Sequence, residues 1–259
     1  LLTSQLRDPD AGVPVGLRVM RIATHHAVRS AGFGSKLLAE IEAEFDAGGG
    51  EERERFEIVD YLSTSYGATP ELCRFWRDNG YRTIHLSSTR NETSGEHSAV
   101  MLHPLSSDGR ALAERHAEWF ARRISDVISG PLRSADPDVV RGALASSSDT
   151  VERPLSAFEW RLVASAAYGP GQYGVAPGPF RRLALRALLD ETDLLDADSE
   201  RLLVVGVLQN RSWEETADAL GYVSERACLR ALGDAFQPIV DAYGDDVAHR
   251  EADRYRSRE

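Results

Sequence analysis

The sequence predicts an α/β (α+β) domain, a mixed sheet with flanking helices, followed by a mainly helical domain. Strand-like and helix-like segments alternate up to about residue 104, and helical periodicity dominates from about residue 109 onwards. The 259 residues are 42% hydrophobic, which is enough for a sizeable core. We place the boundary near residue 106, giving domains 1–106 and 107–259.

The first domain is expected to begin with a strand over residues 17–24, where β-favouring residues alternate with others. A helix should follow over residues 34–45, because apolar residues recur there at helical spacing: Leu37, Leu38, Ile41 and Phe45. A second strand is expected over residues 57–66. The order is therefore strand, glycine turn, helix, strand.

A second helix is predicted to begin at Pro70, with Thr69 as its N-cap and Gly80 at its C-terminal stop. Strands over residues 81–88 and 97–103 complete the order β-α-β-α-β-β. In the helical domain, residues 211–236 predict a short helix, a turn at Gly221 and a longer helix. Such pairs pack in bundles more often than they read DNA, and we expect no DNA partner.

Composition narrows the functional class. The net charge is −11 and Lys36 is the only lysine, so a nucleic-acid partner would have to be held by local arginine clusters. No apolar run is long enough to span a membrane. Cys73 and Cys228 lie far apart in the sequence and are the only thiols, which argues against a zinc cluster or a disulfide-stapled scaffold and fits a reducing cytoplasm.

The segment RSAGFGSKLL, residues 29–38, places two glycines between a strand and a helix. The N-terminus of a helix presents unpaired N–H groups and a positive dipole end, so this junction predicts a phosphate site. The alternative is a simple glycine turn, which is common where a strand leads into a helix. The segment alone leaves both interpretations open.

Longer motifs favour the phosphate interpretation. Residues 29–34 resemble the Arg/Gln-x-x-Gly-x-Gly/Ala loop that binds the acetyl-CoA pyrophosphate in GNAT acetyltransferases. VDYLSTSYGATPELCRFWRDNGY and TSGEHSAVMLHPLS resemble the tRNA(Met) cytidine acetyltransferase (TmcA) family, and so does RIATHH, with His26 where proline is usual. The resemblance continues through RLLVVGVLQNRSWEETADALGY.

The resemblance implies a GNAT-like fold and transfer of acetyl from acetyl-CoA to the exocyclic amine of a cytidine, typically the wobble cytidine of elongator tRNA(Met). Family members also carry an upstream helicase-like ATPase module that binds ATP. No GxxxxGK[ST] motif occurs here, so we expect this chain to be the C-terminal part of such a protein, starting one or two strands inside the fold. The tail, 107–259, is expected to bind tRNA.

The resemblance also implies a set of site residues. The pantetheine arm is expected along the backbone of Ile22, Ala23 and Thr24, and Glu71 should face the cofactor. Asp78 stands where the family often has an arginine, which Arg74 or Arg77 could replace. The pyrophosphate is expected along Arg29, Ser30, Ala31, Gly32, Phe33, Gly34 and Ser35.

His25 is the first candidate for proton acceptor, because it ends the strand beside the loop and histidine titrates near neutral pH. The alternative is that His25 only orients the strand end. His97 is the second candidate. It could instead support its turn or contact RNA.

Two further functions stay open at this stage. A GNAT fold could acetylate a protein or a small amine, although the helical tail argues against it. The chain could also be a non-catalytic RNA-binding or assembly fragment. Arginines of the helical domain could contact RNA or belong to a solvated mixed-charge surface: Arg181, Arg182, Arg186, Arg201, Arg211, Arg226 and Arg230.

Overall fold

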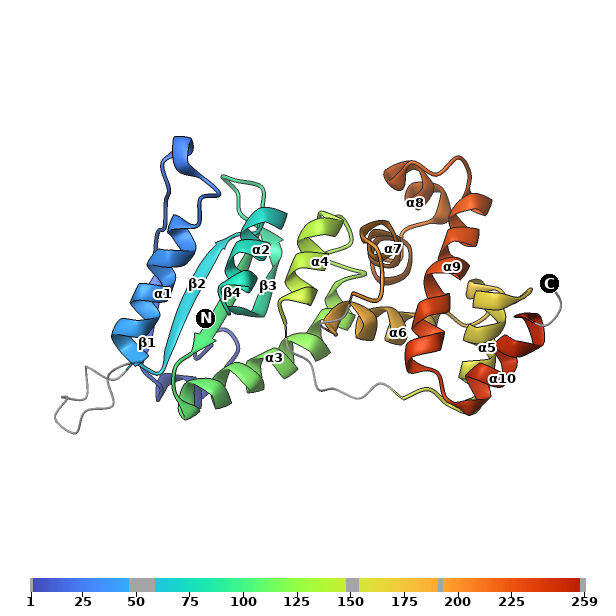
Figure 1. Ribbon diagram of the computed structural model, residues 1–259, viewed down its shortest axis with the longest axis horizontal. Coiled ribbons are helices and arrows are strands. Elements are labelled where there is room, and N and C mark those ends of the chain that lie inside the picture. The colour runs from blue at the N-terminus through green and yellow to red at the C-terminus, as the bar shows by residue number, and fades with distance from the viewer. Residues whose placement is uncertain (1, 47–58, 148–153, 191–192, 257–259) are drawn as a thin grey trace. The chain divides into compact units, whose positions relative to one another are not determined.

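The computed structural model describes residues 2–46, 59–147, 154–190 and 193–256 (Figure 1). The chain divides into two compact units, residues 1–121 with 146–149, and residues 122–145 with 150–259. The change of composition near residue 106 coincides with the start of helix α3, Ser107–Val127, and the division between the units falls within that helix.

A four-stranded mixed sheet forms the first unit, in the order β1-β2-β4-β3. The strands are β1 Gly16–Val19, β2 Tyr61–Gly67, β3 Arg82–Arg90 and β4 His97–Pro104. β1 pairs with β2 in parallel, whereas β4 is antiparallel to both of its neighbours. The predicted fold, a mixed sheet with flanking helices and a helical region after it, is confirmed.

Both faces of the sheet are covered in part. Helices α1, Phe33–Asp46, and α2, Pro70–Asp78, pack on one face through the cluster Leu38, Leu62, Trp76, Tyr81 and Met101. The N-terminal segment and α3 pack on the other face through the cluster Ala11, Ile84, Leu102, Leu112 and Ala113. Neighbouring residues of a strand point to opposite faces, which is why consecutive residues of β4 join different clusters.

Local signals determine the ends of α2 as predicted. The Thr69 hydroxyl accepts a hydrogen bond from the Leu72 N–H at 3.3 Å, and Pro70 occupies the first helical position. After the helix, Gly80 has φ +82°, a left-handed conformation that favours glycine. The chain can therefore turn directly from α2 into β3.

The first strand is shorter than predicted. β1 ends at Val19, whereas the sequence pattern continues to residue 24, because the pairing with β2 stops at Val19–Thr64. The second strand begins at Tyr61; residues 57 and 58 of the expected strand lie outside the described residues.

The second unit is helical, and no strand follows Pro104 in the part of the chain that the structure describes. Its helices are α4 Pro137–Ala145, α5 Ala157–Tyr168, α6 Pro177–Leu189, α7 Ala197–Leu202, α8 Trp213–Leu220, α9 Glu225–Tyr243 and α10 Asp246–Arg256. The predicted turn is present, with Gly221 at φ +75° between α8 and α9. The pair packs within this unit, in agreement with the bundle interpretation.

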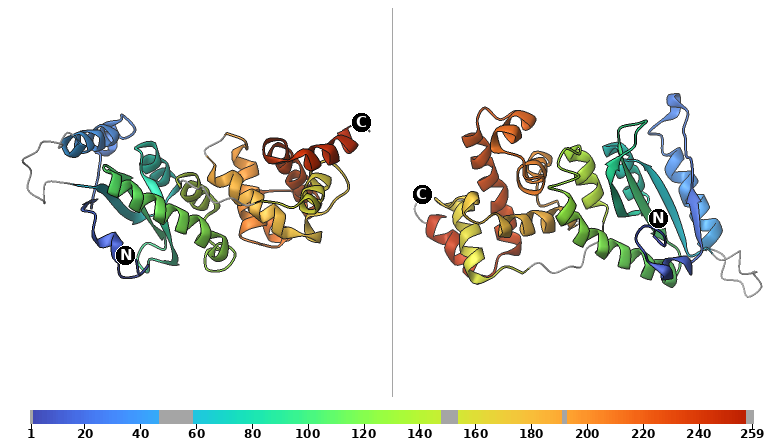
Figure 2. Two further views of the ribbon diagram at one scale, coloured as in Figure 1. Left: turned by 90° about the horizontal axis from the view of Figure 1, so that it is seen from below. Right: turned by 180° about the vertical axis from the view of Figure 1, so that it is seen from behind.

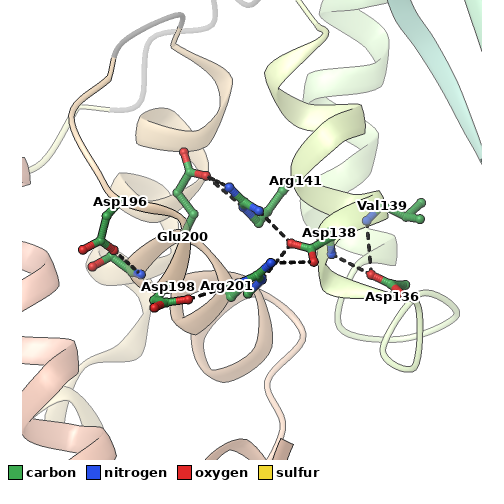
Figure 3. Close-up of polar contacts among 9 residues, drawn as sticks. Asp136, Asp138, Val139, Arg141, Asp196, Asp198, Glu200 and Arg201 are labelled. Atoms are coloured by element: carbon green, nitrogen blue, oxygen red, sulfur yellow. Dashed lines mark hydrogen bonds and ion pairs between the residues drawn. The ribbon is translucent and has the colours of Figure 1, made fainter. Parts of the chain in front are cut away.

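An ion-pair network joins α4 to α7 (Figure 3). Asp138, in the first turn of α4, accepts hydrogen bonds from Arg201 at 2.9 Å and from Arg141 at 2.6 Å. Arg141 also donates to Glu200. The hydrogen bond from Arg201 is the largest of the effects that hold the pKa of Asp138 below its usual range.

We expect Asp138→Asn to lower the free energy of unfolding at pH 7 by about 1–3 kcal/mol, because charged hydrogen bonds are lost. A carboxyl with a lowered folded-state pKa stabilises above its ordinary pKa of 3.8 and loses that stabilisation as the pH falls through the folded value. The variant should therefore approach the wild type below about pH 4 in denaturant unfolding. Asp198→Asn is the control: Asp198 is an exposed partner of Arg201, so this variant should leave the free energy of unfolding almost unchanged. If the free energy of unfolding of Asp138→Asn differed from that of the wild type by the same amount at every pH, the prediction would be contradicted.

Candidate active site

The candidate site begins where two parallel strands separate. β1 and β2 pair over four residue pairs, from Gly16–Tyr61 to Val19–Thr64. β2 continues to Gly67, paired only with β4, while residues 21–24 leave the sheet and make no backbone hydrogen bond within the described chain. The predicted pantetheine-binding residues Ile22, Ala23 and Thr24 thus lie along this opening with free backbone groups.

The topology gathers the predicted site residues at one end of the sheet. β1 and β2 are parallel, so the loop to α1 and the start of α2 both follow strand ends at the same edge. β4 is antiparallel and begins there with His97, since Gly67 pairs with Ser98. Figure 1 and the right-hand view of Figure 2 show the β1–α1 loop and the β3–β4 loop at this end.

The glycine loop is exposed, and its amides are available. Residues 25–33 are all exposed, and the N–H groups of residues 30–35 have no hydrogen-bond partner within the described chain. Lys36 donates to the Gly32 carbonyl at 2.9 Å, the first helical bond of α1. The start of this helix therefore presents free donors and its positive dipole end, which together suit an anion.

The two glycines have different roles. Gly32 has φ +80° and nothing within 4 Å of an added Cβ, so glycine is required there by conformation and open space surrounds it. At Gly34 an added Cβ would lie 3.1 Å from the Phe75 ring of α2. Gly34 therefore lets the first turn of α1 approach α2 closely. The predicted loop residues Arg29, Ser30, Ala31, Phe33 and Ser35 all lie in this exposed stretch.

The two candidate histidines have opposite environments. His25 is exposed, and its Nδ1 accepts a long hydrogen bond of 3.3 Å from the Ala27 N–H. His97 is 6% exposed, with Nδ1 at 2.9 Å from the Ser87 carbonyl and Nε2 enclosed without a partner. Of the two candidates, only His25 presents its ring to solvent.

The remaining predicted residues vary in accessibility. Glu71 is exposed in the first turn of α2, and Ile22 packs against the core cluster beneath α1. Asp78 is paired with Arg77 at 3.3 Å, so Arg77 is not a free replacement for the family arginine. Arg74 has no ion pair within the described chain.

One titratable group at this edge was not singled out from the sequence. The Glu96 carboxylate lies against Gly67, where an added Cβ would be 2.0 Å from its Oε2. The contact joins the β3–β4 loop to the end of β2. The only signal in the sequence is the glycine itself, and nothing local pairs it with a residue 29 positions away.

Five of the seven arginines proposed to contact RNA are engaged within the fold. Arg181 and Arg211 donate to backbone carbonyls, while the others pair with carboxylates: Arg182 with Glu159, Arg186 with Asp190, and Arg201 with Asp138 and Asp198. Arg226 and Arg230, one turn apart on α9, are exposed and have no partner within the described residues. Near them Val223 is 95% exposed.

Within the described ranges, no group of three or more His, Cys, Asp or Glu side chains could hold a metal ion. Among the same residues, no helix is long and apolar enough to cross a membrane.

Comparison with known proteins supports the resemblance. The family described as GNAT acetyltransferase 2 matches residues 49–106, the segment that contains β2, α2, β3 and β4. A protein named tRNA(Met) cytidine acetyltransferase TmcA from Haloferax volcanii is 53% identical over 99% of this chain. The chain is homologous to part of TmcA. The TmcA proteins of Haloarcula marismortui and Nitrosococcus halophilus are 51% and 37% identical over 98% and 92% of the chain.

The matched part is a minor share of each TmcA protein. The chain spans about a third of the length of these curated relatives, namely 33%, 32% and 31% of the three. The resemblance to GNAT acetyltransferases and to TmcA is confirmed. What the whole relatives do is carried to this chain only as a proposal.

Proposed function

We propose that this chain is the acetyl-transferring part of a cytoplasmic TmcA-type enzyme, which acetylates the exocyclic amine of a cytidine in tRNA to give N4-acetylcytidine. The wobble cytidine of elongator tRNA(Met) is the proposed acceptor, and ATP would act through an upstream module outside this sequence. One observation carries the proposal: the amides of residues 30–35, at the start of α1 beside separating parallel strands, have no hydrogen-bond partner within the described residues.

These residues fit the diphosphate of acetyl-CoA. An anion at the start of α1 can accept hydrogen bonds from several free amides, and no side chain obstructs the approach at Gly32. The exposed Arg29 adds a positive charge next to them. The backbone of residues 22–24 has no hydrogen-bond partner among the described residues, and it would offer its N–H and C=O groups to the amides of a pantetheine arm.

Acetyl-CoA supplies a thioester carbonyl as the acyl donor. The cytosine amine is a weak nucleophile, since its lone pair is delocalised into the ring, so positioning and proton removal are what the protein must provide. In the net reaction, a C–N bond forms and the C–S bond breaks, and the proton that the amine gives to a base is returned by that base, directly or through water, to the thiolate leaving group. The base must therefore be accessible at the end of the sheet.

His25 is the proposed base, because His97 has its Nε2 enclosed. With Nδ1 accepting from Ala27, neutral His25 carries its proton on Nε2. To accept a proton at Nε2, His25 must first carry its proton on Nδ1. That tautomer loses only the long hydrogen bond from the Ala27 N–H. His97 instead holds the β3–β4 loop through its contact with Ser87.

The helical unit is proposed to bind the RNA through Arg226 and Arg230. They are the members of the arginine set that remain available, they lie on one face of α9, and arginine can pair with phosphate or stack on a base.

Incubation with acetyl-CoA and total tRNA, with and without ATP, tests the function by nucleoside mass spectrometry. We expect acetylated cytidine in the tRNA digest. If acetyl-CoA binds but no acetylated cytidine forms, either with this chain or with ATP and a longer protein that includes the upstream module, a protein or small-amine acceptor would be favoured. Absence of acetyl-CoA binding would favour a non-catalytic RNA-binding module.

Gly32→Glu should abolish acetyl-CoA binding in calorimetry, because a carboxylate would project toward the diphosphate. Gly221→Glu is the matched control, since Gly221 also has positive φ and nothing within 4 Å of an added Cβ, but lies at the end of α8. The control should bind acetyl-CoA as the wild type does. Wild-type affinity in Gly32→Glu would refute the loop assignment.

His25→Ala should lower the rate of acetyl transfer about a hundredfold or more, through loss of the base. Acetyl-CoA affinity should change by no more than about twofold, because binding rests on backbone groups. His26→Ala, the adjacent exposed histidine, is the control and should keep its rate. Equal rates for the two variants would place the base elsewhere.

A further inference from the structure

The sheet face opposite α1 and α2 carries a groove that the proposed function leaves unassigned. Its volume is about 400 Å³, and its floor is made by alternate residues of all four strands, among them Arg18, Ser63, Ser65 and Ser98. The N-terminal segment lines one side through Leu2, Thr3, Gln5 and Ala11. This size suits a ligand of one nucleotide.

The N-terminal wall is held in place by a polar anchor. The Asp8 carboxylate accepts hydrogen bonds from Arg115 at 2.7 Å and lies 2.8 Å from Nε2 of the buried His116, both on α3. These contacts fix the segment against α3 beside the sheet. The wall is therefore a part of the folded unit.

Strand register places the polar groups in rows. Arg18 pairs with Ser63, and Ser65 pairs with Val100, which in turn pairs with His85. Side chains of paired residues share a face, so these rows run across the sheet. The Ser63 hydroxyl donates to the Leu17 carbonyl, whereas the hydroxyls of Ser65 and Ser98 have no partner within the described residues.

An aromatic ring lines the groove beside β1. Tyr61 lies across Gly16, where an added Cβ would be 2.3 Å from its ring. The half-buried ring thus lies on backbone and lines the groove. A flat aromatic surface at such a position can stack a base of any sequence.

The charge of the groove is opposite to that of the chain. The chain has a net charge of −11, yet no Asp or Glu lines this groove, and Arg18 lines it without an ion pair within the described residues. An exposed cation with hydroxyls and an aromatic wall suits a ligand that combines a phosphate with a planar polar ring.

The groove adjoins the opening between the strands. Arg18 and Ser63 belong to the last paired stretch of β1 and β2, and Ser65 follows where β1 has ended. A ring held over Ser65 would lie next to the place where the strands separate. The amides at the start of α1 belong to the other face, so donor and acceptor could approach the opening from opposite sides.

We infer that this groove binds the acceptor pyrimidine nucleotide of the RNA, an assignment that rests on the proposed function. Ser65 and Ser98 hydrogen-bond to the polar edge of the base, and Arg18, which pairs with Ser63, binds a phosphate. Tyr61, four residues before Ser65 on β2, closes the opposite end of the groove. The groove thereby selects a single unpaired nucleotide and presents its exocyclic amine at the opening.

Photocrosslinking tests the assignment without requiring turnover. The probe is a short RNA stem-loop with 4-thiouridine in place of the acceptor cytidine, bound to the full chain and irradiated. Mass spectrometry should locate the crosslink on groove residues. Crosslinks confined to other residues, or none, would overturn the proposal.

Variants make the test quantitative. Arg18→Ala and Ser65→Leu should each weaken stem-loop binding about tenfold in fluorescence anisotropy, through loss of a phosphate contact and filling of the floor. Arg110→Ala, which removes an exposed arginine of α3 outside the groove, should bind as the wild type does. Unchanged affinity of Arg18→Ala and Ser65→Leu would overturn the proposal.

Calorimetry with acetyl-CoA separates this inference from the proposed function. The groove variants should bind acetyl-CoA with wild-type affinity, because the loop of residues 29–35 lies on the other face. If the wild type binds acetyl-CoA but the groove variants retain RNA binding, only the groove assignment fails. If the wild type binds no acetyl-CoA, the proposed enzymatic function fails, and the groove assignment, which rests on it, fails with it.

Discussion

The parallel pairing of β1 with β2 ends after four residue pairs, and the candidate site depends on that ending. Up to Val19 the backbone groups of β1 that face β2 are used by the sheet. Beyond it, the chain leaves β2, and its N–H and C=O groups, which have no partner in the part of the chain that the structure describes, lead to the edge where both helices begin. These groups are exposed to solvent, so leaving them unpaired costs little in the free protein. The same groups can bind an extended, polar ligand.

Core packing determines the position of the start of α1. Leu38 is buried in the cluster with Trp76 and Met101, and Gly34 allows contact with Phe75. The helix is therefore held by its second turn, while its first amides need no partner of their own. A helix fixed in this way can present free donors in a constant direction, which is what an anion site requires.

The positive charges available to an RNA are confined to a few places on this acidic protein. The chain is strongly acidic, and most arginines proposed to contact RNA bind carboxylates or backbone carbonyls of their own unit. Arg226 and Arg230 on α9 are the exceptions in that set, and Arg29 beside the glycine loop and Arg18 in the groove likewise have no ion pair within the described residues. Recognition of RNA by such a surface would depend on a few contacts and on stacking, because the overall charge repels phosphate.

The sequence by itself determined the features that depend only on neighbouring residues, namely helix ends, turns and the glycine loop. Thr69 and Gly80 set the ends of α2, Gly221 the turn before α9, and residues 29–35 the glycine loop, because capping and left-handed backbone are local properties. Only the tertiary structure decided that β1 ends at Val19, that His97 is enclosed while His25 is exposed, and that the groove on the far face lacks acidic side chains. Each of these depends on strand pairing or packing between residues distant in sequence, which no local pattern records.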